Sequence, residues 1–458
     1  MLTADKALEL VRSNVFDTIG CTEPVAIAYA ATAAYQHLGG TIEKVEVSIS
    51  VNVFKNAMAV GIPGSDKKGI QFAVALGLVA GDWNKQLRLF EGVKPEHLEE
   101  AGKLASADFI PVSLADVPEK IYIYTKVKTE KGIAEAEIVG AHDNLTSIIV
   151  NGTQVFSQGH VKVQRREAAE GSGNDDIQQI NESLGSSVEA DPAELEGLSM
   201  EELVKAIQAI PVENLAFLTG AVDINVAAAE IGIKNAPGMG LGAGIERLKQ
   251  RGAVGNSLAT RVEQYVAAAA DSRMSGMMVP IKGCGGSGNH GIAFFLGTGL
   301  AFREYEQEMQ TSLEQTLAMG LLLVRYIKVY TGLLTPTCGV TVSAAPAIAA
   351  SLVFAMGGSP AQMTASVKLV LGNIAGILCD GAKHGCALKA ATSARFGVQA
   401  AFLALDGVTI PDSDGIVGAD LPDSLNFLRK LQNKGLTDAD KTMLEILMEK
   451  SERIAESQ

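Results

Sequence analysis

The sequence is poor in aromatic residues and in charge. Aromatic side chains make up 5% of the 458 residues, with one tryptophan, and charged side chains make up 20%. Glycine, in contrast, reaches 48 residues, a composition that favours helices packed through small residues over an aromatic-rich sandwich. The net charge of −14 lacks the basic excess typical of nucleic-acid-binding proteins, so we expect no nucleic-acid partner.

Strongly apolar runs are also scarce. Residues 329–367 carry no charge, but the run is interrupted by Pro336, Pro346 and Pro360 and is rich in Ala, Ser, Thr and Gly. A membrane-spanning helix needs about 20 strongly apolar residues. We therefore predict buried helices here and no membrane partner. The amphipathic N-terminal segment lacks the apolar core of a signal peptide, so we expect a cytoplasmic protein.

Cysteine is rare and odd in number. Five cysteines indicate free thiols or a metal site in a reducing compartment more than disulfides. Cys379 and Cys386 lie in CDGAKHGC, where Gly381 and Gly385 loosen the backbone between them. Cys338 opens another apolar, helix-like run. Three thiols in nearly uncharged surroundings indicate a soft-metal or iron–sulfur site. Buried, unreactive thiols are the alternative.

The hydrophobic periodicity predicts an α+β protein, with a small mixed module near the N-terminus and a large all-helical catalytic part. Residues 3–19 are predicted to form a helix. Strict alternation predicts a strand in KVEVSISV, followed by a second extended piece, NVFKNAMAVGIPG. The expected domains are N-terminal helices that pack on the catalytic domain (1–41), an α+β domain (42–165), an acidic linker (166–198) and a helical cluster-binding domain (199–458).

Two short segments near the N-terminus carry candidate site residues. In GCTEP, Cys21 or Thr22 is expected to cap a helix, and the positive end of the helix dipole is expected to lower the pKa of Cys21. Cys21 is therefore a candidate base or nucleophile, with an inert N-cap thiol as the alternative. In NVFKN, Asn52 and Asn56 can donate to a substrate carboxylate or hold a turn.

The glycine-rich loop GCGGSGNHG, residues 283–291, precedes a predicted helix that begins near Asn289. Its glycines let the backbone approach a ligand, but the GxxxxGK[ST] pattern of a phosphate loop is missing. Ser287, Asn289 and His290 suit recognition of a small carboxylate or amine, and a plain tight loop with a satisfied histidine is the alternative. Cys284 in the same loop is a rival cluster ligand.

Taken together, GCTEP, NVFKN, GCGGSGNHG, CGVTVSAAPA and CDGAKHGC resemble the L-cysteine desulfidases, relatives of the iron–sulfur L-serine dehydratase alpha region. The resemblance spans nearly the whole chain. It implies a [4Fe–4S] cluster on Cys338, Cys379 and Cys386, with one iron open to substrate, and Cys21 as the base. The candidate substrate-binding residues are then Thr22, Glu23, Asn52, Asn56, Ser287, Gly288, Asn289 and His290. Serine dehydratases differ by an SSHT-type N-terminal motif and a wider spacing of their last two ligands, neither of which is found here.

The resemblance implies β-elimination from L-cysteine, which yields pyruvate, hydrogen sulfide and ammonia. One alternative is an iron–sulfur L-serine dehydratase, which yields pyruvate and ammonia. Another is a non-catalytic iron–sulfur carrier or sensor, which normally needs a fourth cysteine ligand, here Cys284 or Cys21. A structural zinc protein is a third. The expected partner is a small amino acid, and the assembly we consider is a homodimer, although the sequence does not define the oligomeric state.

Overall fold

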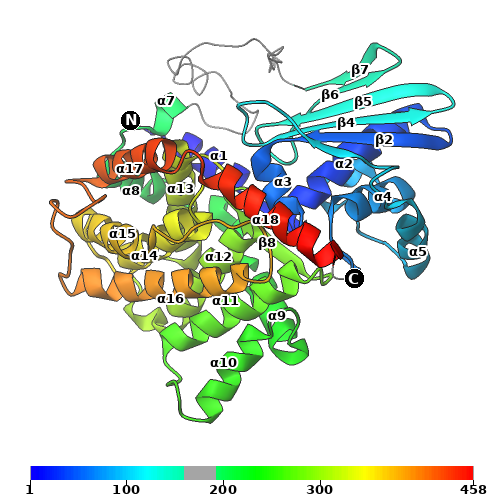
Figure 1. The fold of residues 1–458 in the computed structure, drawn as a ribbon. Helices are drawn as coiled ribbons and strands as arrows, with labels where there is room; N and C mark the ends of the chain where they lie inside the picture. Colours follow the sequence, from blue (N-terminus) through cyan, green and yellow to red (C-terminus); the bar gives the residue numbers. More distant parts are fainter. Residues whose placement is uncertain (1, 159–191, 457–458) are drawn as a thin grey trace. The chain divides into compact units, whose positions relative to one another are not determined.

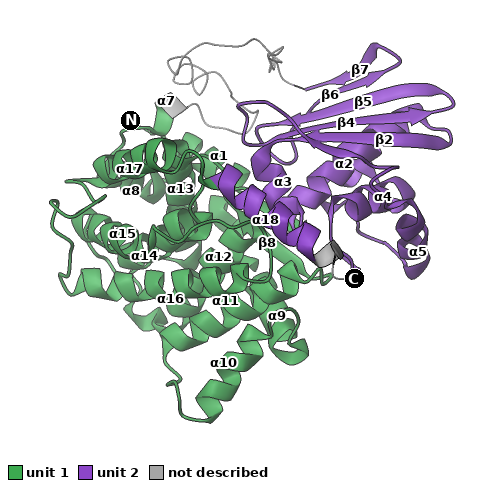
Figure 2. Ribbon diagram, viewed as in Figure 1, with its two compact units in different colours: residues 1–20, 192–439 green, residues 21–191, 440–458 purple. Residues whose placement is uncertain are grey.

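The computed structural model describes residues 2–158 and 192–456 and divides into two compact units, coloured separately in Figure 2. Unit 1 consists of Met1–Gly20 and Pro192–Ala439, and unit 2 of Cys21–Asp191 and Asp440–Gln458. The α+β class, with a small mixed part and a large helical part, is confirmed. These divisions differ from the expected domain boundaries, which stay predictions, and residues 159–191, with most of the predicted linker, lie outside the described residues.

Unit 2 is built on a six-stranded sheet with the order β3-β2-β4-β5-β6-β7. β2 and β3 are parallel, and the other neighbouring strands are antiparallel. The strand predicted in KVEVSISV is confirmed as β2. Side chains along β4 alternate between buried and more exposed positions, as expected for a sheet with one covered face. The strands are β2 (Ile42–Ile49), β3 (Val112–Leu114), β4 (Tyr122–Thr129), β5 (Gly132–Val139), β6 (Leu145–Val150) and β7 (Thr153–Ser157).

The central helix of unit 2 is α2 (Thr22–Leu38), which packs on β4, β5 and α4 and is buried over most of its length. The other helices are α3 (Val51–Ala57), α4 (Ile70–Ala80), the 3₁₀ helix η1 (Trp83–Arg88), α5 (Pro95–Leu104) and α18 (Ala439–Glu456). The extended conformation predicted after β2 is wrong over residues 51–57. There Val53 and Ala57, four residues apart, bury one face of the helix α3.

The predicted helix over 3–19 is wrong beyond Ser13. In unit 1, α1 (Ala4–Ser13) is followed by β1 (Val15–Ile19), which pairs antiparallel with β8 (Pro280–Cys284). Asn14, between α1 and β1, donates from Nδ2 to the carbonyl of Leu321 at 2.8 Å and accepts from the Gly285 amide at 2.9 Å. These long-range contacts stop the helix, which local periodicity could not predict.

The rest of unit 1 is helical, as the labels in Figure 1 show. α11 packs against α9, α10, α12 and α16, and α14 packs against α13, α15 and α16. These contacts use small residues: a Cβ at Gly232 of α9 would collide with the carbonyl oxygen of Ala268 in α11. The elements are α7 (Pro192–Leu195), α8 (Met200–Gln208), η2 (Val212–Leu218), α9 (Ala221–Asn235), α10 (Leu241–Gln250), α11 (Leu258–Met274), α12 (Gly288–Glu304), η3 (Glu306–Glu308), α13 (Leu313–Thr331), the π-helix η4 (Val340–Ala344), α14 (Ala345–Ala355), α15 (Pro360–Ile374), α16 (Cys386–Leu405), α17 (Leu421–Lys430) and the π-helix η5 (Leu431–Gly435).

The charge-free run forms buried helices, as predicted: every residue of η4 and α14 is buried. A different run, 212–235, is the only described one long and apolar enough to cross a membrane by length and composition, with 39% of the tested window buried. Core helices meet the same criterion, and this run is interrupted at Gly220, whose φ is 80°.

Candidate functional site

Unit 1 brings together the three cysteines predicted to hold a cluster. An isolated antiparallel bridge joins Thr337 to Leu378, so the segments that carry Cys338 and Cys379 lie side by side. The Cys338 amide donates to the Ile377 carbonyl at 2.7 Å, and the Cys379 amide donates to the Pro336 carbonyl at 2.8 Å. Cys386 is the first residue of α16, and its thiol faces the Gly381 carbonyl at 3.5 Å. All three are partly exposed.

The three sulfurs are close enough to influence one another's ionisation. Burial raises the pKa of Cys338 to about 12, and negative charge on Cys379 and Cys386 contributes to this rise. Burial likewise raises the pKa of Cys386 to about 11, with a contribution from Cys379. Neighbouring thiols that resist joint ionisation are a donor set that a multivalent cationic centre would stabilise as thiolates.

The loop between Cys379 and Cys386 is held by charge. Asp380 pairs with Lys383, with Nζ and Oδ2 3.0 Å apart, and with Lys389. Burial opposes ionisation of Asp380, but the hydrogen bonds from Lys389 and Lys383 outweigh it and lower its pKa. Gly381 has a φ of 89°, which a residue with a side chain adopts at a cost. The backbone between Cys379 and Cys386 thus forms a turn that ends at α16, at a point where Gly381 was expected to loosen the chain.

The glycine loop stands at the N-terminus of α12, as predicted. Ser287 is the N-cap residue, but its side chain makes no capping hydrogen bond. Asn289 accepts from Nη1 of Arg273 at 3.2 Å and donates to the sulfur of Met274 at 3.3 Å. Its side chain is thus oriented by α11, and the first turn of α12 keeps N–H groups that a ligand can use.

His290 connects this loop to the cysteines. It is 6% exposed, and neither ring nitrogen has a hydrogen-bond partner in the described part of the chain. A Cβ at Gly339, the residue after Cys338, would lie 2.6 Å from Nε2 of His290 and 3.4 Å from Nζ of Lys328. Burial, Lys328 and Arg273 hold the pKa of His290 well below its usual range, so the ring is neutral. The predicted loop and the predicted cysteines therefore meet at Gly339.

Cys284 has a different environment. It lies on β8 opposite Val15 and is 0% exposed. Burial raises its pKa to about 12, and the charge of Lys328 opposes this rise. Cys284 is thus a buried strand residue, and its role as a rival cluster ligand stays a prediction.

Unit 2 contains the other predicted site residues, and its polar centre is Glu23. Cys21 is the N-cap of α2, and its thiol donates to Oε2 of Glu23 at 2.9 Å. Thr22 donates to the same oxygen at 3.0 Å, and Asn56 donates to Oε1 at 2.9 Å. Nε2 of His142 lies 3.8 Å from Oε1. The carboxylate holds the Cys21 thiol in a fixed position and is also a proton acceptor for it.

Asn52 makes a separate contact. Its amide donates to Oδ2 of Asp440 at 2.7 Å, and Lys55 pairs with Oδ1 of the same carboxylate. Lys55 is 1% exposed. Asn52 and Asn56 thus lie on one helix, α3, and each already donates to a carboxylate of this chain. Their assignment to substrate stays a prediction.

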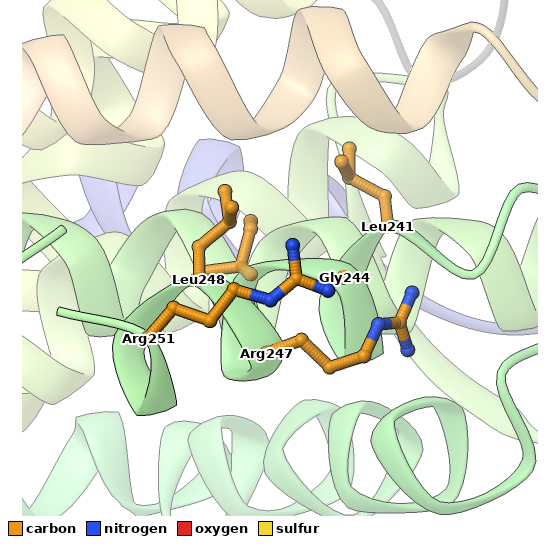
Figure 3. A pocket seen from close by; sticks show the side chains of 6 residues that line it. Leu241, Gly244, Arg247, Leu248 and Arg251 are labelled. Atoms are coloured by element: carbon orange, nitrogen blue, oxygen red, sulfur yellow. The ribbon is translucent and has the colours of Figure 1, made fainter. Parts of the chain in front are cut away.

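Among the described residues, no group of three or more His, Cys, Asp or Glu side chains could hold a single metal ion. A pocket of about 330 Å³, shown in Figure 3, is lined by α10 residues that include Leu241, Arg247, Leu248 and Arg251. None of its lining residues belongs to the predicted site, so we assign it no role.

The sequence analysis missed four buried polar residues and one half-buried partner: Lys55, His142, Arg273, Lys328 and, half-buried, Asp440. Arg273 could have been found from the sequence, because it lies with Asp271 at the end of the alanine-rich run AAAADSRM. Charged residues are rarely buried in a core helix unless they have a partner or a function. The others gave no local signal, since their partners are distant in sequence.

The chain is similar to known proteins over most of its length. The family model for the serine dehydratase alpha chain matches residues 84–445, a stretch that contains the three clustered cysteines and the glycine loop but begins after GCTEP and NVFKN. A UPF0597 protein of Desulforapulum autotrophicum is 33% identical over 445 residues, covering 96% of this chain and 97% of its own. UPF0597 proteins of Desulfatibacillum aliphaticivorans and Clostridioides difficile are 32% and 31% identical, each covering 96% of this chain and 98% of their own.

A match over well more than half of the chain, to a model that includes the clustered cysteines and the loop beside them, establishes the relationship: the chain belongs to the serine dehydratase alpha chain family.

Proposed function

We propose that the chain is a β-eliminating lyase that converts L-cysteine to pyruvate, hydrogen sulfide and ammonia. The observation that carries the proposal is the convergence of Cys338, Cys379 and Cys386 beside the loop that contains His290. All three thiols are partly exposed and Cys386 opens α16, which suits a centre that must be reached by substrate.

These three cysteines would hold a [4Fe–4S] cluster. The fit rests on their chemistry: three thiols of one type, near enough that Cys379 and Cys386 raise the pKa of Cys338 and that Cys379 raises the pKa of Cys386. When bound, such a cluster supplies a Lewis acid for the departing sulfur. Softness of the sulfur ligand is the reason for choosing L-cysteine over L-serine.

The protein's own groups would perform the remaining tasks. The first turn of α12, with Ser287, Gly288, Asn289 and His290, would bind the substrate through its polar groups. Cys21 would first give its thiol proton to Glu23, which accepts its hydrogen bond, and the resulting thiolate would take the Cα proton. Loss of the β-sulfur leaves 2-aminoacrylate, which tautomerises to an imine and hydrolyses to pyruvate and ammonia.

L-Serine is the second candidate substrate, because the matching family model is that of the serine dehydratase alpha chain. The same elimination would then release water in place of sulfide. The two substrates are compared directly by measuring pyruvate and sulfide from anaerobically prepared protein. Turnover of L-serine equal to or above that of L-cysteine would assign the serine reaction.

Cysteine variants test the roles of the thiols. We expect C338A, C379A and C386A each to lose bound iron. C284A should retain both iron and turnover, and C21A should retain iron but lose turnover. The carrier or sensor hypothesis predicts the opposite for these two residues. Both C21A and C284A should then lose iron, and the parent protein should have no catalytic activity.

A further inference from the structure

Arg273, in the last turn of α11, is a buried cation. Its side chain is 2% exposed. Nη1 donates to Oδ1 of Asn289 and, at 3.4 Å, to the sulfur of Met274, while Nε has no hydrogen-bond partner in the part of the chain that the structure describes. No ion pair of Arg273 is found among residues 2–158 and 192–456. Burial of an ionised group is costly unless the charge is compensated, so this position calls for an anion.

The guanidinium lies against the N-terminus of α12. A Cβ at Gly288, the first residue of that helix, would collide with Nε of Arg273 and lie 2.8 Å from Cζ. The N-terminus of a helix carries a partial positive charge and unpaired N–H groups, and Ser287 does not cap it through its side chain. Two positive groups thus face one another, and Lys328 adds a third charge that acts on His290 as Arg273 does.

Such an arrangement is stable when an anion lies between the positive groups. A planar carboxylate fits it best, because guanidinium N–H groups and helix N–H groups can each bind one of its oxygens. Asn289 fixes the guanidinium from α12, and Gly288 leaves the space that it needs. The neutral ring of His290 adds no competing charge.

We infer that Arg273, together with the first turn of α12, binds the α-carboxylate of the amino-acid substrate. The inference rests on the proposed lyase function for the identity of the ligand, but the anion site itself stands on the geometry of α11 and α12. It makes Arg273 a specificity-determining residue: an amine or thiol without the carboxylate would not use it. Neutralising the carboxylate would also make the Cα proton easier to remove.

Three ligands separate the carboxylate from the other substrate groups. 3-Mercaptopropionate has the thiol and the carboxylate, cysteamine has the thiol and the amine, and propionate has the carboxylate alone. Titration calorimetry on anaerobic holoprotein gives the affinities of the first two, and the rise in Tm at high concentration reports propionate. In R273M we expect 3-mercaptopropionate to bind about 30-fold more weakly or worse, since a buried charge pair loses one partner. Cysteamine should change less than about threefold, and stabilisation by propionate should disappear.

Matched variants guard against a trivial loss of structure. R303M removes a guanidinium from the other end of α12, where Arg303 already pairs with Asp223 at 2.7 Å, and should leave all three ligands unaffected. G288A should reproduce R273M, because the new methyl group displaces the guanidinium. R273K keeps the positive charge but lacks the two parallel N–H donors of a guanidinium, so it should bind 3-mercaptopropionate about tenfold more weakly. This variant provides the test if R273M does not fold.

The inference is overturned if folded R273M or R273K binds 3-mercaptopropionate as parent protein does, or if cysteamine weakens to the same extent. Failure of the lyase proposal looks different. In that case cysteamine does not bind to the parent protein and no substrate turns over, while loss of propionate stabilisation in R273M still supports the anion site. An equal rise in Tm with propionate in the parent protein, R273M and G288A would reject the anion site.

Discussion

Replacement of Asp440 by alanine should destabilise unit 2 strongly, because it leaves a buried ammonium without its partner. Lys55 is 1% exposed and pairs with Oδ1 of Asp440, whose side chain is 16% exposed. The other oxygen of Asp440 accepts from Asn52 at 2.7 Å. Two buried side chains on α3 therefore bind the same carboxylate, which lies in the first turn of α18.

The magnitude follows from these exposures. Removing one partner of a buried ion pair costs about 3–5 kcal/mol, and the partial exposure of Asp440 places this pair at about 3 kcal/mol. Loss of the acceptor for Asn52 adds about 1 kcal/mol. D440A should therefore lower the free energy of unfolding of unit 2 by about 4 kcal/mol. K55M should cost less, about 2 kcal/mol, because the carboxylate that it leaves behind is more exposed and keeps Asn52.

The double variant K55M/D440A gives the sharper test. It removes the ammonium together with the carboxylate, so it should be more stable than D440A alone. This sign does not depend on the absolute size of either single effect. The double variant also distinguishes an uncompensated charge from a simple loss of packing. If only packing were lost, the destabilisation of the double variant would equal the sum of the two single ones.

Tryptophan fluorescence during urea unfolding provides the assay. The single tryptophan, Trp83, belongs to η1 in unit 2 and lies edge-on to His37 at 4.9 Å and Phe156 at 6.1 Å. Its emission therefore reports the unfolding of unit 2. E445A, at an exposed position of α18, is the matched control and should stay within about 0.5 kcal/mol of the parent. A cost below about 1 kcal/mol for D440A, or additive costs in the double variant, would refute the reasoning.

The remaining predictions concern packing, proton linkage and the Glu23 centre. G232A should lower the free energy of unfolding by about 3 kcal/mol, because its methyl group meets the Ala268 carbonyl. G244A, where the nearest atom is 3.7 Å away, should raise it by about 0.5–1 kcal/mol through helix propensity. Circular dichroism during urea unfolding compares the two variants. Burial, Lys328 and Arg273 depress the pKa of His290 in the folded chain. Below about pH 6.5 the unfolded chain therefore binds a proton at this histidine that the folded chain does not bind. The free energy of unfolding should fall there by up to about 1.4 kcal/mol for each pH unit. H290Q should flatten the stability profile between pH 7 and 5, and an unchanged slope would exclude this origin. E23Q leaves one amide oxygen for the three donors Cys21, Thr22 and Asn56, so it should lower the free energy of unfolding by about 2 kcal/mol. Trp83 fluorescence during urea unfolding measures this change, and an unchanged stability would contradict the hydrogen-bond network.

Local sequence signals were sufficient where the chain decides its structure locally. Alternation predicted β2, and the start of α8 has an equally local cause, because the side chains of Ser199 and Glu202 form a capping box there. The closeness of Cys338, Cys379 and Cys386 was expected from the resemblance. None of this required knowledge of distant contacts.

The errors have the opposite origin. β1 is a strand because it pairs with β8, which lies more than two hundred and fifty residues later in the sequence. α3 is a helix although it follows directly on an alternating strand, and its polar residues are satisfied by Glu23 and by Asp440. No periodicity reveals partners so far apart, so these elements could be found only from the folded chain.

The distribution of charge gives the two groups of predicted substrate residues different chemistry. In unit 2, the donors Asn52, Lys55 and Asn56 are already satisfied by carboxylates of the chain, so a substrate carboxylate would have to compete with Glu23 or Asp440. In unit 1, Arg273 is buried beside a helix N-terminus and has no carboxylate among the described residues. Binding free energy is gained where a charge lacks its partner, because elsewhere an existing pair must first be broken. We therefore propose that α11 and α12, and not α3, recognise the substrate carboxylate, with the Cys21–Glu23 pair proposed for proton transfer.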